Sequence, residues 1–435
     1  MLLSLLSHKL QFLKRNVLSL NSQANLEIPL CLNQLKTNLP MSMLSRRHFL
    51  QFAGATLGTL GLSKLERYGE VLAHSTPRKV ALLVGINDYS EGVGPLKGCV
   101  NDVFMQRELL IHRFGFNPKD IHLLLDQDAT REGMLGAFEE YLIKGVKPGD
   151  IAVYHYSGHG SRVSDPNPIF TGTRGGDDLN GTFVPIDSTF SQDEPEKVKD
   201  IMGHTLYLLM SAVPTENFTA VLDSCFSGGA KRIARIRSRN EPTEGVVSSE
   251  EKSYQEKWLG KLDLAPEEFI AGYRRGVAKG VVIASTDPNQ YAADATLNGF
   301  SAGAFTYAFT QYLWQEDTTP EKAVAHAIND IQERNLGFDQ TPTLEAEVNS
   351  NYEKQPIYLT PTTKRAAHAV VTRVEGKQAK FWLGGIDPGE VDLGMYFSVS
   401  GKDALVRYRS RNGLLAIGKV VGDVSPGDLL MLDNG

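Results

Sequence analysis

The sequence predicts an α/β fold with a mostly parallel central sheet, followed by a small all-β module. The middle of the chain alternates short apolar segments with amphipathic segments of helical period, and this alternation is typical of a parallel sheet with helices on both faces. After about residue 365 the segments become shorter and alternate apolar with polar residues, which is typical of antiparallel strands. With 435 residues, the chain is long enough for two or three domains at roughly 100–200 residues each.

The predicted strands of the α/β part are short apolar runs that end in turn residues, as expected for strands buried on both faces. The predicted helices carry apolar residues at helical spacing, and Gly115 and Thr130 are suited to end one helix and begin the next. The strands span residues 79–86, 121–125, 150–157, 218–223 and 281–285. The helices span residues 101–114, 130–143, 206–213, 302–313 and 323–334.

The C-terminal residues 365–435 form short alternating runs separated by Gly- and Pro-containing turns. They predict a small barrel-like module of five or six strands. The module contains no catalytic constellation, and docking to a partner is the role that we expect for it. The runs span residues 369–374, 378–383, 395–400 and 414–421.

The overall composition is that of an ordinary globular protein. Hydrophobic residues make up 41% of the chain and charged residues 22%, and the formal net charge is −6. The densest basic run, residues 231–239, is short. We therefore expect no nucleic-acid partner.

The N-terminal residues resemble a twin-arginine export signal. Arg46 and Arg47 precede a moderately apolar, Gly- and Ala-rich run at residues 51–62. A membrane span needs about 20 apolar residues, so this run predicts no stable span. We expect export to the periplasm, the thylakoid lumen or another extracytoplasmic space, and a cytoplasmic location if the leader does not function. Residues 1–44 upstream of the signal have no assigned role.

A histidine and a cysteine follow two of the predicted strands. His159 lies in Ser157-Gly158-His159-Gly160, two residues after one strand, and Cys225 lies in Asp223-Ser224-Cys225, two residues after the next. Because the carboxyl ends of parallel strands meet at one edge of a sheet, both side chains are expected at the same edge. A thiol beside an imidazole is the arrangement that nucleophilic cysteine catalysis requires. The backbone N–H groups of Gly160 and Cys225 are candidates for an oxyanion hole.

Two other roles are open to the cysteines. The chain has three, Cys31, Cys99 and Cys225. A cysteine after an apolar run is often only a small buried hydrophobic residue, and a disulfide between Cys99 and Cys225 stays an alternative. We favour a reactive thiol at Cys225, because the histidine and the cysteine are each framed by small residues at a strand end.

These two motifs resemble the catalytic dyad of caspase-like cysteine peptidases, and most closely the metacaspase and orthocaspase branch, the latter from prokaryotes. The resemblance covers about residues 78–360. Asp223-Ser224-Cys225 stands where the aspartate-cleaving caspases carry Gln-Ala-Cys-x-Gly, which points away from them. The resemblance implies a three-layer sandwich and a cysteine endopeptidase that cleaves peptides and proteins after arginine or lysine.

The resemblance also implies an acidic specificity pocket. Its matching positions are Asp102 and Asp223, with Cys99 and Ser157 in the wall. Asp223 precedes Cys225 by two residues and so lies on the same side of the pleat, where a carboxylate would pair with a guanidinium. The alternative for Asp102 is a charge that stabilises the N-terminal end of a helix dipole.

Self-processing between a large and a small part is a further implication. The basic run after Cys225 falls in a predicted exposed linker, residues 231–275, and offers several bonds of the implied specificity. The alternative is that this run only solvates the surface. The candidate cleavage residues are Arg232, Arg235, Arg237 and Arg239.

Calcium is the only metal that the sequence suggests, and no cofactor is expected to be required. Metacaspases often bind calcium through an acidic cluster, and Asp177, Asp178 and Asp187 lie close together after His159. Carboxylate oxygens are suitable ligands for this ion. The spacing does not match an EF-hand loop.

The predicted organisation combines these elements along the chain. Two alternatives to an Arg- or Lys-directed peptidase stay open: a catalytically silent caspase-fold scaffold, and a peptidase with the same dyad but Asn or Asp specificity. The expected parts are the leader (1–44), the export signal and linker (45–77), the large part with the dyad (78–230), the processing linker (231–275), the small part (276–362) and the β module (365–435).

Overall fold

The structure is a computed structural model. It divides the chain into two compact units, Met1–Ser75 and Thr76–Gly435. The predicted leader and export signal lie outside the described residues, apart from Pro77. The described residues are 77–165, 168–169, 179–189, 198–225, 236–239, 245–288, 290–335 and 340–433.

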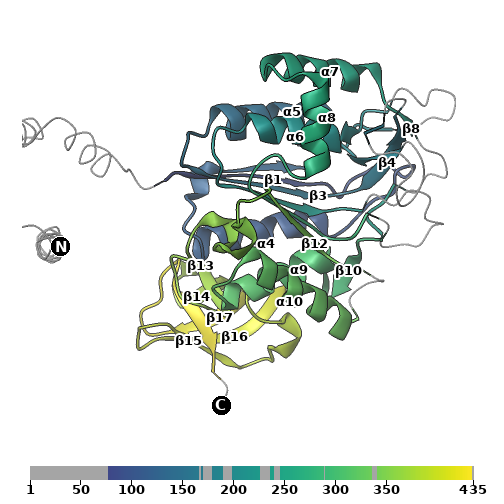
Figure 1. Ribbon diagram of the computed structural model, residues 1–435. Helices are drawn as coiled ribbons and strands as arrows, with labels where there is room; N and C mark the ends of the chain where they lie inside the picture. The colour runs from purple at the N-terminus through teal and green to yellow at the C-terminus, as the bar shows by residue number, and fades with distance from the viewer. Residues whose placement is uncertain are drawn as a thin grey trace, which may run out of the picture. The chain divides into compact units, whose positions relative to one another are not determined.

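A six-stranded sheet of order β12-β9-β7-β3-β1-β2 forms the centre of the second unit (Figure 1). Its strands pair in parallel, except that β12 runs antiparallel to β9. All five predicted strands are confirmed, and β12 is an addition that the sequence pattern did not indicate. The strands are β1 (Lys79–Gly85), β2 (Ile121–Leu125), β3 (Ile151–Ser157), β7 (Phe218–Asp223), β9 (Val281–Ala284) and β12 (Thr343–Ala346).

Helices cover both faces of this sheet, so the predicted three-layer arrangement is confirmed (Figure 1). Successive strand residues face opposite layers: in β1, Ala81 and Leu83 pack into one core and Leu82 and Val84 into the other. One layer contains α4 (Cys99–His112), α9 (Ala304–Gln315) and α10 (Pro320–Glu333). The other contains α5 (Arg131–Ala137), η3 (Phe138–Lys144), α6 (Gly203–Ala212), α7 (Ser249–Lys261) and α8 (Pro266–Arg275).

The prediction of an exposed linker over residues 231–275 is wrong for its second half, which forms α7 and α8. The Ser248 side chain caps α7 by accepting a hydrogen bond from the Glu251 amide at 3.2 Å. Trp258 and Phe269 are buried in the core beside α6. The many acidic and basic residues of this segment occupy the outer faces of the helices and concealed their apolar stripe.

Two smaller β elements lie outside the main sheet. A four-stranded sheet has the order β6-β5-β4-β8, and a two-stranded hairpin joins β10 to β11. The sequence pattern predicted none of these strands, because each is short. They are β4 (Gly160–Ser164), β5 (Leu179–Phe183), β6 (Ile201–Met202), β8 (Gly245–Val246), β10 (Asp294–Leu297) and β11 (Phe300–Gly303).

The C-terminal module is a closed barrel of six strands, as predicted. Two of its strands, β16 and β18, were not predicted. The strands are β13 (Ala369–Glu375), β14 (Gln378–Trp382), β15 (Tyr396–Val399), β16 (Leu405–Asn412), β17 (Leu415–Val421) and β18 (Leu429–Leu432).

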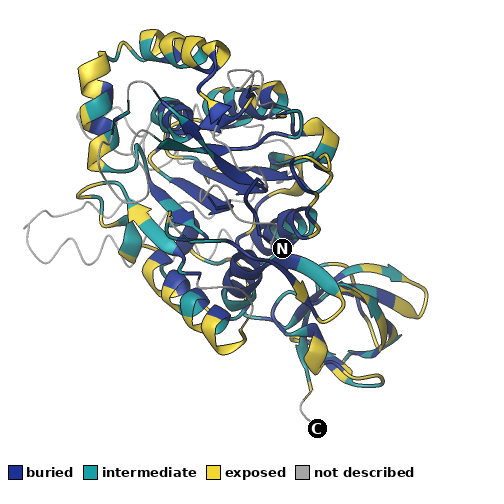
Figure 2. Cartoon of the chain, turned by 90° about the vertical axis from the view of Figure 1, so that its right-hand side faces the viewer, coloured by how far each residue is buried: buried dark blue, intermediate teal, exposed yellow. Residues whose placement is uncertain are grey.

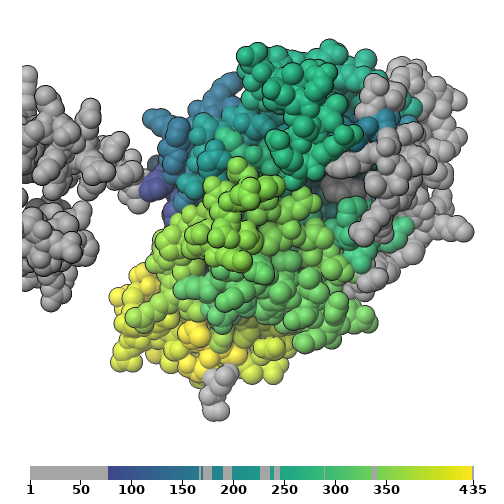
Figure 3. Space-filling view, in the orientation of Figure 1, coloured from purple at the N-terminus to yellow at the C-terminus, as the bar shows by residue number. Residues whose placement is uncertain are grey.

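The barrel shares a hydrophobic core with the helix layer that contains α4, α9 and α10. Trp314 of α9 is only 1% exposed, and its ring lies so close to Gly384 that a Cβ atom there would approach it to 2.3 Å. One cluster of buried side chains includes residues of the central strands and of the barrel, and Figure 2 shows buried segments in both parts. The space-filling view shows barrel side chains in direct continuation of the α9 and α10 surface (Figure 3).

Among the described residues, no helix has both the length and the apolar character that crossing a bilayer requires.

We predict that Gly384→Ala lowers the free energy of unfolding by about 1–3 kcal/mol, because the added methyl group would overlap the buried Trp314 ring and force a shift in the packed core. The measurement is urea denaturation followed by tryptophan fluorescence. The matched control is Gly260→Ala in α7, where a Cβ atom would meet nothing within 4 Å and the higher helix propensity of alanine is stabilising. An unchanged urea midpoint for Gly384→Ala would show that the barrel does not depend on this contact.

Candidate active site

His159 and Cys225 extend from the carboxyl ends of two neighbouring strands. β3 and β7 pair in parallel, and their last paired residues are Ser157 and Asp223. Each functional residue lies two positions beyond that pair. The predicted meeting of the two motifs at one sheet edge therefore follows directly from the register of the two strands.

The imidazole of His159 is held in one orientation. Its Nε2 donates to the carbonyl oxygen of Gly94 at 2.6 Å, so this nitrogen carries the hydrogen of the neutral ring. Its Nδ1 has no hydrogen-bond partner among the described residues and is free to accept a proton. The hydroxyl of Tyr89 accepts a hydrogen bond from the His159 amide at 3.1 Å. Burial lowers the pKa of His159 to about 4, which keeps the imidazole neutral near pH 7.

The thiol of Cys225 is completely buried and packs against Ile236 and Ala292. Cys99 is buried as well, and neither cysteine forms a disulfide, so the alternative of a disulfide between them is wrong. Burial raises the pKa of the Cys99 thiol well above its usual value. Cys99 is therefore a neutral group at the start of α4, next to Ser157 and Arg237.

The backbone amides of Gly160 and Cys225 converge on one carbonyl oxygen, that of Arg237. The N···O distances are 3.0 Å from Gly160 and 3.3 Å from Cys225. Residues 236–239 pass through the site with isolated β-bridges at Ile236 and Ser238 and a bend at Arg237. The Arg237 amide donates to the Ala292 carbonyl at 3.0 Å, and the Arg239 amide donates to the Gly160 carbonyl at 3.1 Å. The peptide bond between Arg237 and Ser238 consequently lies at the two strand ends that carry His159 and Cys225.

The guanidinium of Arg237 fills a pocket made of three carboxylates. It pairs with Asp102 at 2.7 Å, Asp223 at 3.2 Å and Asp294 at 3.1 Å. Arg237, Asp102 and Asp223 are 0% exposed, and Asp294 is 6% exposed. Arg237 Nη1 also donates to Ser157 Oγ at 2.7 Å. The pocket residues predicted from sequence are thus brought together, but around an arginine of the same chain.

The helix layer of α4 and α9 holds the first two carboxylates in place. Asp102 lies in the first turn of α4 and accepts hydrogen bonds from Ser157 Oγ at 2.7 Å and the Gly303 amide at 2.9 Å. Asp223 accepts from the amide and the hydroxyl of Thr306 at 3.1 and 2.6 Å. Because Asp102 is both in a first helical turn and in the pocket, its two predicted roles are compatible.

Gly303 has no room for a side chain. A Cβ atom there would lie 2.1 Å from an Asp223 carboxylate oxygen and 2.7 Å from Arg237 Nη1. The glycine therefore allows the guanidinium to approach the backbone at the end of β11.

Sequence reasoning missed Asp294, the third carboxylate. It is the first residue of β10 and accepts hydrogen bonds from the Lys97 and Gly98 amides, both at 2.9 Å. No motif or periodicity marks this aspartate, because the hairpin reaches the pocket only through the tertiary fold.

Three carboxylates around one guanidinium leave an excess of buried negative charge. Burial raises the pKa of Asp102 to about 7, although the positive charge of Arg237 lowers it.

The predicted exposure of the basic run is wrong for its described part. Residues 236–239 are buried, and Arg239 forms a buried ion pair with Asp200. The other two cleavage candidates, Arg232 and Arg235, lie outside the described residues.

The candidate calcium ligands are only partly described. Asp177 and Asp178 lie outside the described residues. Asp187 accepts a hydrogen bond from the Arg131 amide at 2.8 Å and pairs with Lys199 at 3.0 Å. In the described part of the chain, no group of three or more His, Cys, Asp or Glu residues is arranged to hold a metal ion.

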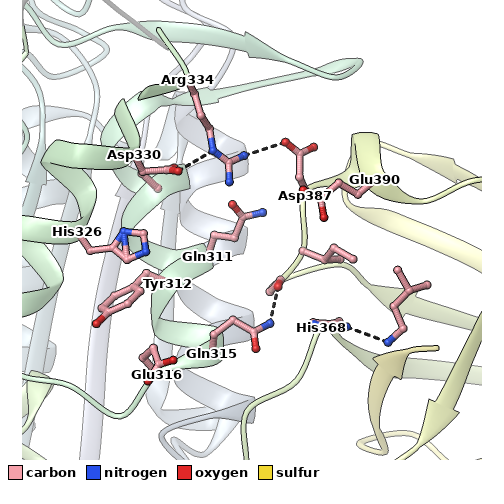
Figure 4. Close-up of a pocket in the computed structure, with 14 residues that line it drawn as sticks. Gln311, Tyr312, Gln315, Glu316, His326, Asp330, Arg334, His368, Asp387 and Glu390 are labelled. Atoms are coloured by element: carbon pink, nitrogen blue, oxygen red, sulfur yellow. Dashed lines mark hydrogen bonds and ion pairs between the residues drawn. The ribbon is translucent and has the colours of Figure 1, made fainter. Parts of the chain in front are cut away.

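A separate cavity of about 420 Å³ lies between α9, α10 and the barrel (Figure 4). At its rim Arg334 bridges Asp330 at 2.6 Å and Asp387 at 2.8 Å. Gln315 also lines this cavity and donates to backbone carbonyls of the barrel side. The residues that line this cavity do not include His159, Cys225 or any residue described above in the arginine pocket, so the cavity is distinct from the candidate active site.

Comparison with known proteins agrees with this geometry. A family model described as Caspase domain matches residues 78–352, more than half of the chain. Metacaspase-1 of Schizosaccharomyces pombe is 28% identical over 278 residues, which cover 55% of this chain and 60% of that protein. Metacaspase-1 of Mycosarcoma maydis is 28% identical over 284 residues, which cover 58% of this chain and 67% of that protein.

The chain spans about three fifths of the length of the first of these curated relatives. Among solved structures, protein GSU0716 from Geobacter sulfurreducens superposes with a TM-score of 0.44 and 21% identity. The match covers 65% of this chain and 99% of that one.

We predict that Arg237→Gln exposes Cys225. Loss of the guanidinium leaves three buried carboxylates without a countercharge, which is strongly unfavourable, so residues 236–239 should leave the site. The measurement is alkylation by iodoacetamide followed by mass spectrometry of the uncleaved chain. Labelling of Cys225 should accelerate at least about tenfold while Cys99 stays protected.

The matched control is Arg373→Gln, which removes an exposed arginine that pairs with Glu375 on the barrel. This control should label at the wild-type rate. Equal labelling of Cys225 in all three proteins would show that Arg237 does not hold the segment in the site.

Proposed function

The chain belongs to the caspase-domain family, and from that premise we propose that it is a cysteine endopeptidase that cleaves peptide bonds after arginine or lysine. One observation carries the proposal: the carbonyl oxygen of an arginine accepts hydrogen bonds from the Gly160 and Cys225 amides while its guanidinium fills a pocket of three carboxylates. Substrate binding by such an enzyme requires this combination, with the reacting carbonyl and the specificity side chain fixed at the same time.

The proposed chemistry uses Cys225 as nucleophile and His159 as base. His159 Nδ1 takes the proton of the thiol, and the sulfur attacks the carbonyl carbon of the arginine. The negative charge that develops on the carbonyl oxygen is stabilised by the Gly160 and Cys225 N–H groups, and one such donor typically contributes about 3–4 kcal/mol to lowering the barrier. His159 then gives the proton to the departing amine, and in a second step activates the water that hydrolyses the thioester.

The pocket charges favour a basic side chain before the cleaved bond. A neutral side chain would leave Asp102, Asp223 and Asp294 buried without a countercharge, and an aspartate would add a fourth negative charge. The planar fork of arginine can bond several carboxylates at once, whereas lysine supplies a single point charge. These charges favour Arg and Lys over the alternative of Asn or Asp specificity.

The same geometry supports self-processing at the Arg237–Ser238 bond. Of the two candidate residues that the structure describes, Arg237 and Arg239, it is Arg237 whose carbonyl oxygen accepts hydrogen bonds from both amides. His159 and Cys225 are buried while this segment occupies the site. We therefore propose that the intact chain blocks its own active site and that cleavage after Arg237 allows the segment to leave.

The rival proposal is a catalytically silent scaffold on the same fold. It is less well supported, because the Cys225 thiol forms no disulfide, His159 Nδ1 has no hydrogen-bond partner among the described residues, and the Gly160 and Cys225 amides converge on one carbonyl oxygen. Export by the twin-arginine route, calcium binding by Asp177, Asp178 and Asp187, and partner docking by the barrel stay predictions.

We predict that the purified wild-type chain converts to two fragments that separate between Arg237 and Ser238, as measured by intact mass. Cys225→Ala and Arg237→Gln should both abolish this cut, the first through loss of the nucleophile and the second through loss of the specificity side chain. Arg235→Gln is the matched control and should still cleave after Arg237. Cleavage at this bond by the Cys225→Ala chain would contradict the assignment of the nucleophile.

We also predict that Asp294→Asn lowers kcat/KM for an arginine reporter peptide by at least about tenfold, because a charged hydrogen bond to the guanidinium is lost. Glu140→Gln, which alters an exposed pair with Lys144, is the control and should retain wild-type kcat/KM. Undiminished activity of Asp294→Asn would remove this residue from the pocket.

A further inference from the structure

We propose that the site also recognises the second residue after the cleaved bond, and that Asp200, with Ser188 and Thr182, forms a subsite for arginine or lysine at that position. The inference rests on the proposed function, because it takes residues 236–239 as the chain's own bound substrate. It adds a second specificity element, on the opposite side of the cleaved bond from the three-carboxylate pocket.

The register of the bound segment assigns Arg239 to this position. Ser238 forms a parallel bridge with Gly160, and the Gly160 backbone donates to the Arg237 carbonyl and accepts from the Arg239 amide. These two main-chain bonds fix the segment on both sides of the Arg237–Ser238 bond. Any extended peptide that binds in this register presents its second residue after the cut where Arg239 lies.

The Arg239 guanidinium is bound in a buried site. Its Nη2 pairs with Asp200 and donates to Ser188 Oγ at 3.2 Å. The Arg239 side chain is 3% exposed and that of Asp200 is 1% exposed. A pair this far from solvent contributes much more to selectivity than a surface pair, because either charge alone would be buried without compensation.

The Asp200 carboxylate is oriented by groups that do not belong to the bound segment. Ser188 Oγ donates to one of its oxygens and Thr182 Oγ1 donates to the other, both at 2.7 Å. Thr182 belongs to β5, and Asp200 directly precedes β6, which pairs with β5. Thr182 and Asp200 are therefore held by the pairing of β5 with β6, and we expect the subsite to persist after cleavage.

The neighbouring cations that the structure describes, Lys199 and Arg131, pair with other carboxylates. Lys199 pairs with Asp187, and Arg131 donates to the Asp200 backbone carbonyl at 3.0 Å and pairs with Glu251 at 2.6 Å. In the described part of the chain, Arg239 is the one cation paired with the Asp200 carboxylate. The site thus requires a positive charge from whichever peptide occupies it.

The expected substrates are consequently peptides of the form Arg-x-Arg or Arg-x-Lys, cut after the first basic residue. A neutral residue at the third position would desolvate Asp200 without a partner, which costs free energy. This requirement would restrict cleavage to a subset of the arginines and lysines exposed on other proteins.

The test compares two internally quenched peptides with the self-processed enzyme. One contains Ile-Arg-Ser-Arg and the other Ile-Arg-Ser-Gln, with identical flanks. We expect the wild type to cleave the first with at least about a tenfold higher kcat/KM. In Asp200→Asn the ratio of the two values should fall towards 1, and because the ratio is taken within each protein, a general loss of activity does not affect it.

Lys199→Gln is the matched control, since Lys199 is adjacent to Asp200 but pairs with Asp187, and its ratio should equal that of the wild type. In the full chain, Arg239→Gln should slow self-cleavage after Arg237 and Arg239→Lys should restore it. The Arg239 variants keep every active-site residue of the wild type. Their self-cleavage rates therefore test the Asp200 subsite even if Asp200→Asn does not fold.

Equal kcat/KM for the two peptides with the wild type would overturn the subsite and leave the proposed function intact. Failure to cleave either peptide, together with an intact Arg237–Ser238 bond in the purified chain, would overturn both.

Discussion

The buried cluster of Arg237 with Asp102, Asp223 and Asp294 is the interaction on which the rest of the site depends. Each carboxylate comes from a different part of the fold: the start of α4, the end of β7 and the start of β10. A buried excess of negative charge is unfavourable unless a cation fills it. In the intact chain the guanidinium of Arg237 provides this positive charge. In the same position, the Arg237 carbonyl oxygen accepts hydrogen bonds from the Gly160 and Cys225 amides.

The parallel sheet explains why these groups meet at all. β3 and β7 are neighbours in register, so the residues that follow them emerge side by side. Alternation along each strand directs Ser157 and Asp223 toward the α4 and α9 layer, where Asp102 and Thr306 complete the pocket. The two loops beyond the strand ends then place His159 and Cys225 beside the same peptide bond. The geometry of the candidate active site thus follows from the strand order, the pleat and the helix layer together.

The bound segment makes the structure informative about substrates as well as about the enzyme. Arg237 and Arg239 lie on either side of Ser238, and each enters a separate buried acidic site. A basic linker in an ordinary surface position would instead keep both guanidinium groups in water. The barrel adds a contiguous core through Trp314 and a separate cavity beside α9 and α10, but it contributes no residue to this cluster.

The sequence by itself determined the five parallel strands of the central sheet, the presence of a small β-barrel with four of its six strands, and the two short motifs of His159 and Cys225, because local periodicity and small-residue turns are encoded in adjacent residues. It also indicated Asp102 and Asp223, which lie close to recognisable motifs. Only the tertiary structure showed that Asp294 joins Asp102 and Asp223 around Arg237 and that Asp200 pairs with Arg239. These ion pairs join segments that are far apart in the chain and meet only through packing. The spacing of residues in the sequence does not predict which buried carboxylate pairs with a given arginine.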